Sequence, residues 1–278
     1  VKRDAEKLKA AKGILPGLGF ILVGENPASE VYVRMKGKAC EEVGFYSVTE
    51  QMPKNTPESS VLGKIKEWNT DPKIHGILVQ LPLPTHINEE TVVQAVDPRK
   101  DVDGFHPVNV GKLVMGQQAF RPCTPAGVQE LLLRAGVNVA GKHVVVVGRS
   151  NIVGKPVAIL LLQKQQGANA VVTVCHTGAK DLTFHTKRAD ILIAAMGRAE
   201  FITGPMIKPG AVVIDVGVNR VGDPAAKSGY RLVGDVHFAS AREVASAITP
   251  VPGGVGPMTI AMLMKNTLLA AQQIVNAD

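Results

Sequence analysis

The stretch HVVVVGRSNIVGKPVA, residues 143–158, decides the fold of this chain. Its run of four valines is typical of a strand buried on both faces of a sheet, and the run leads directly into Gly148. A helix is expected to start near Pro156, because proline is favoured in the first turn of a helix. The backbone N–H groups at such a helix start attract phosphate. The stretch therefore predicts an α/β domain with a dinucleotide site.

Three more apolar strands follow this first one. They are AVVTVCH, ADILIAAMG and GAVVIDVG, at residues 170–176, 189–197 and 210–217. Four strands separated by helical or loop crossovers predict a doubly wound parallel sheet. Ala195-Met196-Gly197 and Asp215-Val216-Gly217-Val218 end two of the strands, where small residues let a ligand approach the sheet.

The residues around this turn favour NADP over NAD. The spacing from Gly148 to Gly154 is not the usual GxGxxG, and Arg149 and Ser150 lie inside the turn. NAD-binding folds usually carry an acid at the end of the second strand, but this chain has Cys175-His176-Thr177 there. Because no carboxylate is present there, a 2′-phosphate would not be repelled. The guanidinium group of Arg149 and the hydroxyl of Thr177 can hold such a phosphate. The alternative is a plain structural turn with a solvated Arg149.

The first half of the chain also alternates strands with helices, which predicts another α/β layer. Helices are expected at residues 1–12, 31–44 with Ser29 as cap, and 57–71 with Trp68 on the apolar face, and strands at 17–24 and 75–84. Residues 101–125 are interpreted as loop and linker. A helix capped by Thr124 is expected at 124–136, and an amphipathic helix from Met258 onward.

Several polar residues are candidates for function, although each is unremarkable alone. Tyr32 and Lys36 stand four residues apart and share one helix face. Gln80 ends an apolar strand, and residues 101–104 (DVDG) form either a turn or a metal loop with too few ligands for calcium. The loop ITPVPGGVGPMT, residues 248–259, offers backbone amides to a planar ring or serves as an interdomain hinge.

Composition narrows the class of protein. The chain has 278 residues, enough for two modest domains, and its net charge of +7 is scattered without a basic block. This pattern argues against nucleic-acid binding and fits either an anionic small-molecule ligand or simply a soluble surface. Cys40, Cys123 and Cys175 form neither a disulfide framework nor a metal motif, which predicts a reducing compartment.

No membrane segment or signal peptide is expected, because no apolar run approaches the roughly 18 residues that a spanning helix needs. The cytoplasm is the expected location. The chain opens at Val1 inside a helical pattern and without methionine. That start leaves an organellar address open.

Six segments together resemble the bifunctional methylenetetrahydrofolate dehydrogenase/methenyltetrahydrofolate cyclohydrolase family. They are SEVYVRMKGKACEEVGF (29–45), GILVQLPLP (76–84), KDVDGFHPVNVGKL (100–113), PCTPAG (122–127), VVVVGRSNIVGKPVA (144–158) and ITPVPGGVGPMT (248–259). The resemblance runs in order from about Pro16 to the C-terminus. KDVDGF and PVPGGVGPMT are its most specific parts. Two loops, near 163–170 and 220–232, are longer than the family pattern.

The resemblance implies two α/β domains around a cleft, the second a Rossmann-like doubly wound parallel sheet. Residues 1–121, completed by the C-terminal helix 256–278, would be the folate-binding catalytic domain. Residues 122–255 would be the NADP-binding Rossmann domain, which usually carries the contact of a homodimer.

The implied activity is that of a multifunctional enzyme, an oxidoreductase and hydrolase of one-carbon metabolism and purine biosynthesis. It oxidises 5,10-methylene-tetrahydrofolate with NADP and hydrolyses the 5,10-methenyl product to 10-formyl-tetrahydrofolate. The substrates include polyglutamylated forms, and no metal, nucleic acid or membrane is expected to take part.

The site residues are carried over by matching motif positions. The expected catalytic residues are Lys36, Gln80 and Asp103. The expected folate-binding residues are Tyr32, Lys36, Val79, Gln80, Leu81, Asp103, Pro252, Gly253 and Gly254. The expected cofactor-binding residues are Gly148, Arg149, Ser150, Thr177 and Val218.

Three other functions compete with this one. A monofunctional NAD-dependent folate dehydrogenase would lack useful hydrolysis, against which Lys36 and Gln80 argue. A dehydrogenase for another pterin or an amino acid would share only the cofactor domain. A non-enzymatic nucleotide sensor would bind the cofactor without turnover, although Lys36, Gln80 and Asp103 are all present.

Overall fold

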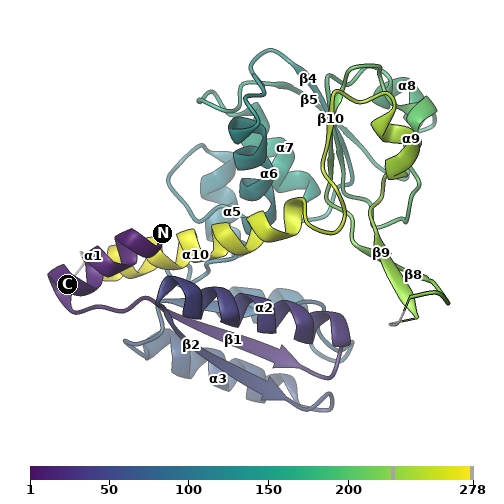
Figure 1. Cartoon of the computed structure of the whole chain (residues 1–278). Coiled ribbons are helices and arrows are strands. Elements are labelled where there is room, and N and C mark those ends of the chain that lie inside the picture. Colours follow the sequence, from purple (N-terminus) through teal and green to yellow (C-terminus); the bar gives the residue numbers. More distant parts are fainter. Residues whose placement is uncertain (227–228, 276–278) are drawn as a thin grey trace. The chain divides into compact units, whose positions relative to one another are not determined.

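A computed structural model describes residues 1–226 and 229–275 of the chain. It divides the chain into two compact units (Figure 1). The first comprises Val1–Cys123 and Ile260–Asp278, and the second Thr124–Thr259. The expected domain boundaries lie two to four residues away, at 121/122 and 255/256. Residues 276–278 of the expected C-terminal helix lie outside the described residues.

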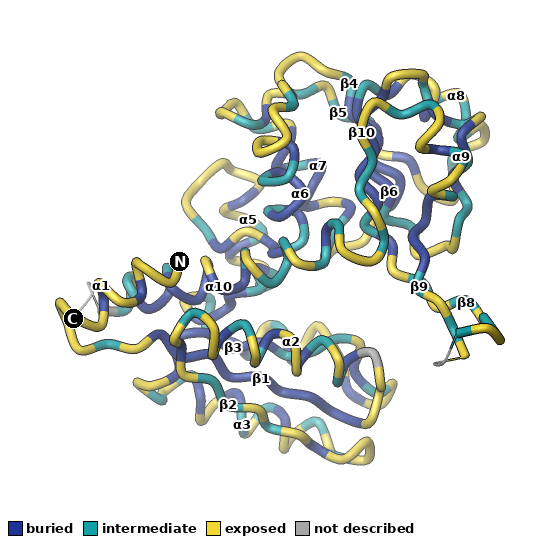
Figure 2. The backbone as a smooth tube through the Cα atoms, viewed as in Figure 1, coloured by how far each residue is buried: buried dark blue, intermediate teal, exposed yellow. Residues whose placement is uncertain are grey.

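The first unit is built on a three-stranded parallel sheet in the order β2–β1–β3. The strands are β1 (Gly17–Val23), β2 (Tyr46–Met52) and β3 (Gly76–Val79). Every residue of the central strand β1 is buried, which Figure 2 shows as an unbroken dark-blue tube. The apolar run GLGFILV therefore forms a strand that is covered on both faces.

Alternate residues of β1 serve two separate cores, as the period of two along a strand requires. Phe20 and its neighbours on that face pack with α1 (Lys2–Lys12), α2 (Pro27–Val43) and α10 (Val255–Val275). Ile21 and Val23 pack with α3 (Glu58–Thr70) and α4 (Glu89–Ala95). Trp68 lies on the buried face of α3, as expected, and a Cβ on Gly19 would come within 2.6 Å of its ring. A glycine is therefore needed where the indole packs.

The second unit carries a five-stranded sheet in the order β10–β7–β6–β4–β5 with parallel pairing throughout. Its strands are β4 (His143–Val147), β5 (Val171–Cys175), β6 (Ile191–Ala194), β7 (Val212–Asp215) and β10 (Ala247–Ile248). Val144 and Val146 belong to one core, whereas Val145 and Val147 belong to the other. The expected two-domain α/β fold with a doubly wound parallel sheet is confirmed, with one strand more than the four expected.

The helices of this unit are short. They are α6 (Cys123–Arg134), α7 (Gly154–Leu162), α8 (Leu182–Thr186) and α9 (Phe238–Arg242), with a 3₁₀ turn at Gly204–Met206. Helix α7 starts at Gly154, directly after the loop that leaves β4 and two residues before Pro156, near which the start was expected.

Several expectations about single elements are wrong. Residues 220–232 were expected to be a polar loop, but residues 220–222 and 230–232 belong to two antiparallel strands, β8 (Asn219–Gly222) and β9 (Tyr230–Val233). Residues 227–228 of this range lie outside the described residues. Residues 101–125 contain the helix α5 (Pro107–Val114). Ser29 does not cap α2, because it is buried inside the helix and Asn26 Oδ1 accepts its N–H at 3.3 Å.

Thr124 is not the cap of α6 either. The helix starts one residue earlier, and the Thr124 hydroxyl lies 2.9 Å from that of Thr259. None of the described helices combines the length and the apolar character that crossing a bilayer requires.

Candidate functional site

A buried lysine and a glutamine meet in the first unit. Lys36 lies on α2 with only 7% of its surface exposed, and its Nζ donates to Gln80 Oε1 at 3.1 Å. Gln80 directly follows β3, and its backbone N–H donates to Ile21 O at 2.9 Å. Its side-chain Nε2 donates to Leu81 O at 2.8 Å, which fixes the direction of the carboxamide. The Gln80 oxygen therefore faces the ammonium group.

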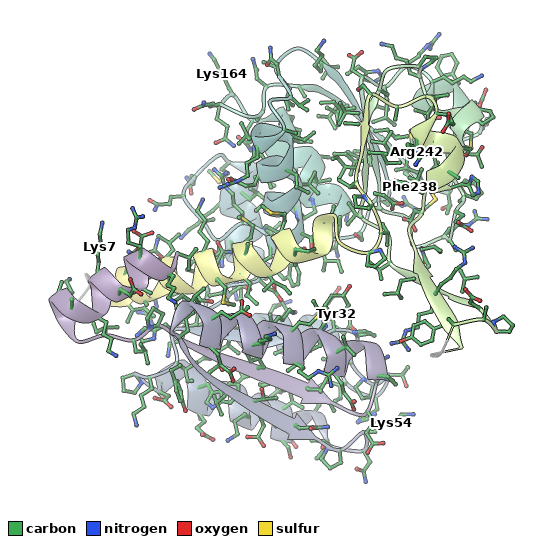
Figure 3. The ribbon with its side chains drawn as sticks, viewed as in Figure 1. Lys7, Tyr32, Lys54, Lys164, Phe238 and Arg242 are labelled. Carbon is green, nitrogen blue, oxygen red and sulfur yellow. The ribbon has the colours of Figure 1, made fainter. Side chains whose placement is uncertain are left out.

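Three further predicted residues flank this pair. Tyr32, labelled in Figure 3, lies one turn before Lys36 on α2, and partial burial raises the pKa of its phenol. Val79 and Leu81 lie on either side of Gln80 and are both partly buried. A polar pair thus lies beside aromatic and aliphatic surface, a combination typical of small-molecule sites.

Asp103 lies close enough to Lys36 for their charges to interact. Burial raises the pKa of the Asp103 carboxyl, while the Lys36 charge and a hydrogen bond with the Cys123 thiol lower it. The structure therefore brings Lys36, Gln80 and Asp103 together within one unit. The combination offers a cation, a neutral amide and a carboxylate at one place.

The loop before α5 is held by Asp101. Its carboxylate accepts from Phe105 N at 3.1 Å, His106 N at 2.8 Å and Asn109 Nδ2 at 2.8 Å. Burial raises the pKa of Asp101 to about 6, against the opposing effect of these hydrogen bonds. These contacts are those of a structural turn.

Across residues 1–226 and 229–275, no three His, Cys, Asp or Glu side chains converge as a metal site.

A residue that sequence reasoning missed fixes the same loop from α10. Asn266 is buried, and its Nδ2 donates to Val102 O at 2.8 Å and to Arg121 O at 3.0 Å. Val102 directly precedes Asp103, so Asn266 holds the backbone that carries the carboxylate. A polar residue within the apolar pattern of the last helix was the available signal.

The remaining residues predicted to bind folate belong to the second unit. Pro252, Gly253 and Gly254 lie in the loop between β10 and α10. Gly253 has a φ of +100°, and a Cβ on Gly254 would collide with Pro250 O. The loop is therefore tightly wound, and Pro252 and Gly253 are exposed.

A cavity of about 350 Å³ opens at the carboxyl ends of β4, β5 and β6. Its lining residues come from the ends of these strands, the segments that follow them and the start of α8, and they are Val147, Gly148, Arg149, Ser150, His176, Thr177, Ala179, Leu182, Ala195, Met196, Arg198 and Phe201. Four of the five predicted cofactor residues thus line one cavity. The fifth, Val218, is exposed beyond the end of β7 and is not among the lining residues.

The turn after β4 has the tight geometry that glycine permits. Gly148 has a φ of +134°, and a Cβ there would collide with Ala195 O. A Cβ on Gly154 would collide with Gly148 O. Ser150 Oγ accepts from Val153 N at 3.1 Å and from Gly154 N at 3.2 Å, so this hydroxyl binds the N–H groups where the turn leads into α7.

The charges that line this cavity suit a phosphorylated ligand. Arg149 and Arg198 both line it, and no Asp or Glu is among the lining residues. Arg198, which sequence reasoning missed, stacks on the Phe201 ring at 4.1 Å. His176 and Thr177 follow β5, at the place where an NAD site usually carries an acid. The residues present therefore fit a dinucleotide that bears a 2′-phosphate.

Comparison with known proteins gives consistent matches for both units. The protein-family model described as "Tetrahydrofolate dehydrogenase/cyclohydrolase, catalytic domain" matches residues 1–103. The family model described as "Tetrahydrofolate dehydrogenase/cyclohydrolase, NAD(P)-binding domain" matches residues 122–275. A "Bifunctional protein FolD" of Syntrophobacter fumaroxidans is 60% identical over 273 residues, which are 98% of this chain and 92% of the relative.

Solved structures agree with these matches. The bifunctional FolD methylenetetrahydrofolate dehydrogenase/cyclohydrolase of Campylobacter jejuni is 47% identical with a TM-score of 0.91, over 98% of this chain and 93% of that chain. The Trypanosoma brucei enzyme, complexed with NADP cofactor and inhibitor, is 42% identical with a TM-score of 0.93, over 99% of this chain and 93% of that chain.

Proposed function

Because this chain belongs to the tetrahydrofolate dehydrogenase/cyclohydrolase family, we propose that it catalyses both reactions of that family. It oxidises 5,10-methylene-tetrahydrofolate to 5,10-methenyl-tetrahydrofolate with NADP, and it hydrolyses the product to 10-formyl-tetrahydrofolate. The observation that carries this proposal is the pairing of Lys36 with Gln80, beside Asp103, in the unit that matches the catalytic domain.

The dehydrogenase reaction depends mainly on the alignment of its reactants. Bound NADP would supply the acceptor for a hydride from the methylene carbon. No strong base is needed, because lone pairs of the folate nitrogens stabilise the cation that forms. Asp103 accepts hydrogen bonds from the pterin edge, and Tyr32 covers one face of the folate. Further folate contacts are assigned to Pro252, Gly253 and Gly254, of which the first two are exposed.

The cyclohydrolase reaction needs proton transfer, which we assign to Lys36. Water adds to the methenyl carbon and loses a proton, and cleavage of a carbon–nitrogen bond then releases the formyl group on one nitrogen while the other takes up a proton. A lysine in water is a poor base at neutral pH, and Lys36 lies largely out of water, with 7% of its surface exposed. Gln80 orients Nζ without adding charge.

The cofactor is assigned to the cavity at the strand ends of the second unit. Gly148 allows the backbone to approach the pyrophosphate, and the positive end of the α7 dipole lies at the same turn. Arg149 and Thr177 would hold the 2′-phosphate, with Arg198 as a second cation on the same cavity. Val218 would contact the nicotinamide side.

A spectroscopic assay with 5,10-methylene-tetrahydrofolate, comparing NADP with NAD, tests the proposal. We expect reduced cofactor to form with NADP. Activity with NAD alone would retain the family and overturn the cofactor assignment. Absence of activity with both cofactors would favour a nucleotide-binding protein without turnover.

We also propose that the chain forms a homodimer through the second unit. Strand β5 lies at the end of the sheet order, and its Val171 and Val174 side chains are 63% and 41% exposed. An exposed apolar edge strand is a ready surface for pairing with another chain. Equilibrium sedimentation of the wild type and of Val174→Lys tests this, because the substitution is expected to shift a dimer toward monomer.

Three finer assignments follow from the proposed chemistry. The product carries a one-carbon unit at the formyl level, which fits a supply of purine biosynthesis. The scattered positive charge fits folates with a polyglutamate chain. Cys40, Cys123 and Cys175 are all buried free thiols, which supports a reducing compartment such as the cytoplasm.

A further inference from the structure

Two buried aspartates lie behind the cofactor cavity and have no part in the chemistry above. Asp215 is the last residue of β7 and is 3% exposed, and Asp235 follows β9 and is fully buried. Burial raises the pKa of Asp215 to about 6, and the neighbouring Asp235 adds to this effect. Burying two carboxylates together is costly unless hydrogen bonds compensate.

Asp235 holds the loop that follows β6. Its Oδ2 accepts from Met196 N at 2.7 Å and from Gly197 N at 2.9 Å, and its Oδ1 accepts from Arg198 N at 2.8 Å. Oδ1 also accepts from Asn219 Nδ2 at 2.9 Å. Three successive N–H groups that converge on one point form an anion-binding concavity, or nest. Here the anion is a side chain of the protein itself.

Asp215 fixes Asp235 and the loop after β7. Its Oδ1 accepts from Gly217 N at 3.0 Å and from Asp235 N at 2.9 Å, and its Oδ2 accepts from Val236 N at 2.9 Å. A Cβ on Gly217 would collide with Asp235, and a Cβ on Gly234 would collide with Asp215. Both glycines therefore leave the room that the carboxylates occupy.

This network ends at the wall of the cofactor cavity. Met196 and Arg198, whose N–H groups Asp235 holds, both line the cavity. Gly217, held by Asp215, directly precedes Val218. The carboxylates thus connect the strand ends of β6 and β7 without lining the cavity themselves.

We propose that Asp235, supported by Asp215, is a positioning residue for the nicotinamide cofactor. By filling the nest after β6 it fixes the wall formed by residues 196–198, and its negative charge excludes a phosphate from that nest. The pyrophosphate therefore binds at the turn from Gly148 to Gly154 and not at the nest after β6. This inference rests on the proposed use of NADP.

Asp235→Asn tests the proposal, since an amide cannot accept all four hydrogen bonds. We expect the Kd for NADP, measured by calorimetry on the full chain, to rise about tenfold or more. Hydrolysis of 5,10-methenyl-tetrahydrofolate, which needs no NADP, should stay within about twofold of wild type. An unchanged Kd, or an equal loss of hydrolysis and NADP affinity, overturns the positioning role.

Asp190→Asn is the matched control. Asp190 directly precedes β6, at the strand end opposite the cavity, and accepts from His143 N at 2.9 Å and Lys208 Nζ at 2.6 Å. The Asp190→Asn variant also loses charge-assisted hydrogen bonds, but its Kd for NADP should differ from that of the wild type by less than about twofold. A similar rise in the Kd for NADP in both variants would mean that Asp235→Asn acts by general destabilisation, and it would overturn the positioning role.

Hydrogen exchange on the wild type keeps the test valid if Asp235→Asn does not fold. The amides of Met196, Gly197 and Arg198 should already be protected without NADP. Rapid exchange that slows only when NADP is added would show that the carboxylate does not hold them, and would overturn the proposal. Protected amides in a wild type that fails to bind NADP would overturn the proposed cofactor and the positioning role, while leaving the network itself intact.

Discussion

Lys36 brings a positive charge into the first unit with a neutral carboxamide as its hydrogen-bond partner. A carboxylate partner would hold the ammonium by a strong charge-assisted bond. Gln80 positions Nζ without that bond, while Asp103 supplies a more distant negative charge. The arrangement leaves the lysine proton available for exchange with a substrate.

Replacing Lys36 with Met should abolish hydrolysis of 5,10-methenyl-tetrahydrofolate, because the side chain keeps most of its length and loses its proton-carrying group. A general acid–base residue is worth about 100-fold or more in rate. Steady-state absorbance of the methenyl substrate measures the loss. Lys38→Met is the control, since Lys38 lies on the same helix with 75% of its side chain exposed. Retained hydrolysis in Lys36→Met would refute the role.

Replacing Arg149 with Ala should weaken the binding of NADP far more than the binding of NAD. The guanidinium is assigned to the 2′-phosphate, and loss of a hydrogen bond between charged groups costs about 1.5–3 kcal/mol, or roughly 10- to 100-fold in affinity. Calorimetric titration with both cofactors measures the ratio. Arg134→Ala, an exposed arginine paired with Glu130 on α6, serves as control. An equal loss for the two cofactors contradicts the assignment.

Single residues differ in how far the sequence reveals them. Lys36, Gln80 and Asp103 were identified through a family resemblance, since spacing alone leaves each of them ordinary, and their roles stay predictions. Asp235 and Asn266 were missed, because their function lies in hydrogen bonds to backbone atoms far away along the chain. A local pattern cannot report such partners.

At the scale of elements, strands with strong apolar runs were predictable and weaker ones were not. The strands β1, β4, β6 and β7 lie where continuous apolar residues predicted them, because burial on both faces demands such runs. Strand β2 was missed because it mixes polar and apolar residues at the edge of its sheet. The helix α4 was missed because it is only seven residues long.

The helix α10 should stabilise the first unit through a single amide. Asn266→Ala would leave Val102 O and Arg121 O without this donor, at a cost of about 1–3 kcal/mol in the free energy of unfolding. The KM for folate substrates should also rise, because Asp103 follows Val102. Urea unfolding followed by Trp68 fluorescence measures the first effect. Gln273→Ala, an exposed position on α10, should leave both unchanged.

At the scale of the whole molecule, buried carboxyls should impose a pH dependence on stability. Burial raises the pKa of Asp101 from 3.8 to about 6. The folded state therefore keeps this proton to higher pH than the unfolded state. The stabilisation is complete below about pH 4 and is lost as the pH rises toward 6, a change of about 3 kcal/mol.

Urea unfolding at several pH values between 4 and 6 measures this dependence. Trp68 reports on the first unit, to which Asp101 also belongs. His75, whose pKa burial lowers, contributes with the opposite sign in the same unit. The Asp101→Asn variant isolates the carboxyl, because its free energy of unfolding should fall less steeply with pH than that of the wild type. If the free energy of unfolding depends on pH equally in the wild type and in Asp101→Asn, the pKa of Asp101 is not raised in the folded state.

The return of α10 to the first unit has a consequence for the order of events on the ribosome. Leu263, Met264 and Leu268 belong to the same core as Phe20 and Leu22, so this core is incomplete until the last helix has been synthesised. The second unit is an uninterrupted stretch, Thr124–Thr259, and is finished earlier. Domains usually fold in the order in which they emerge. In this chain the unit that begins first should be the last to reach its native state, and until then its apolar sheet face is open to chaperones.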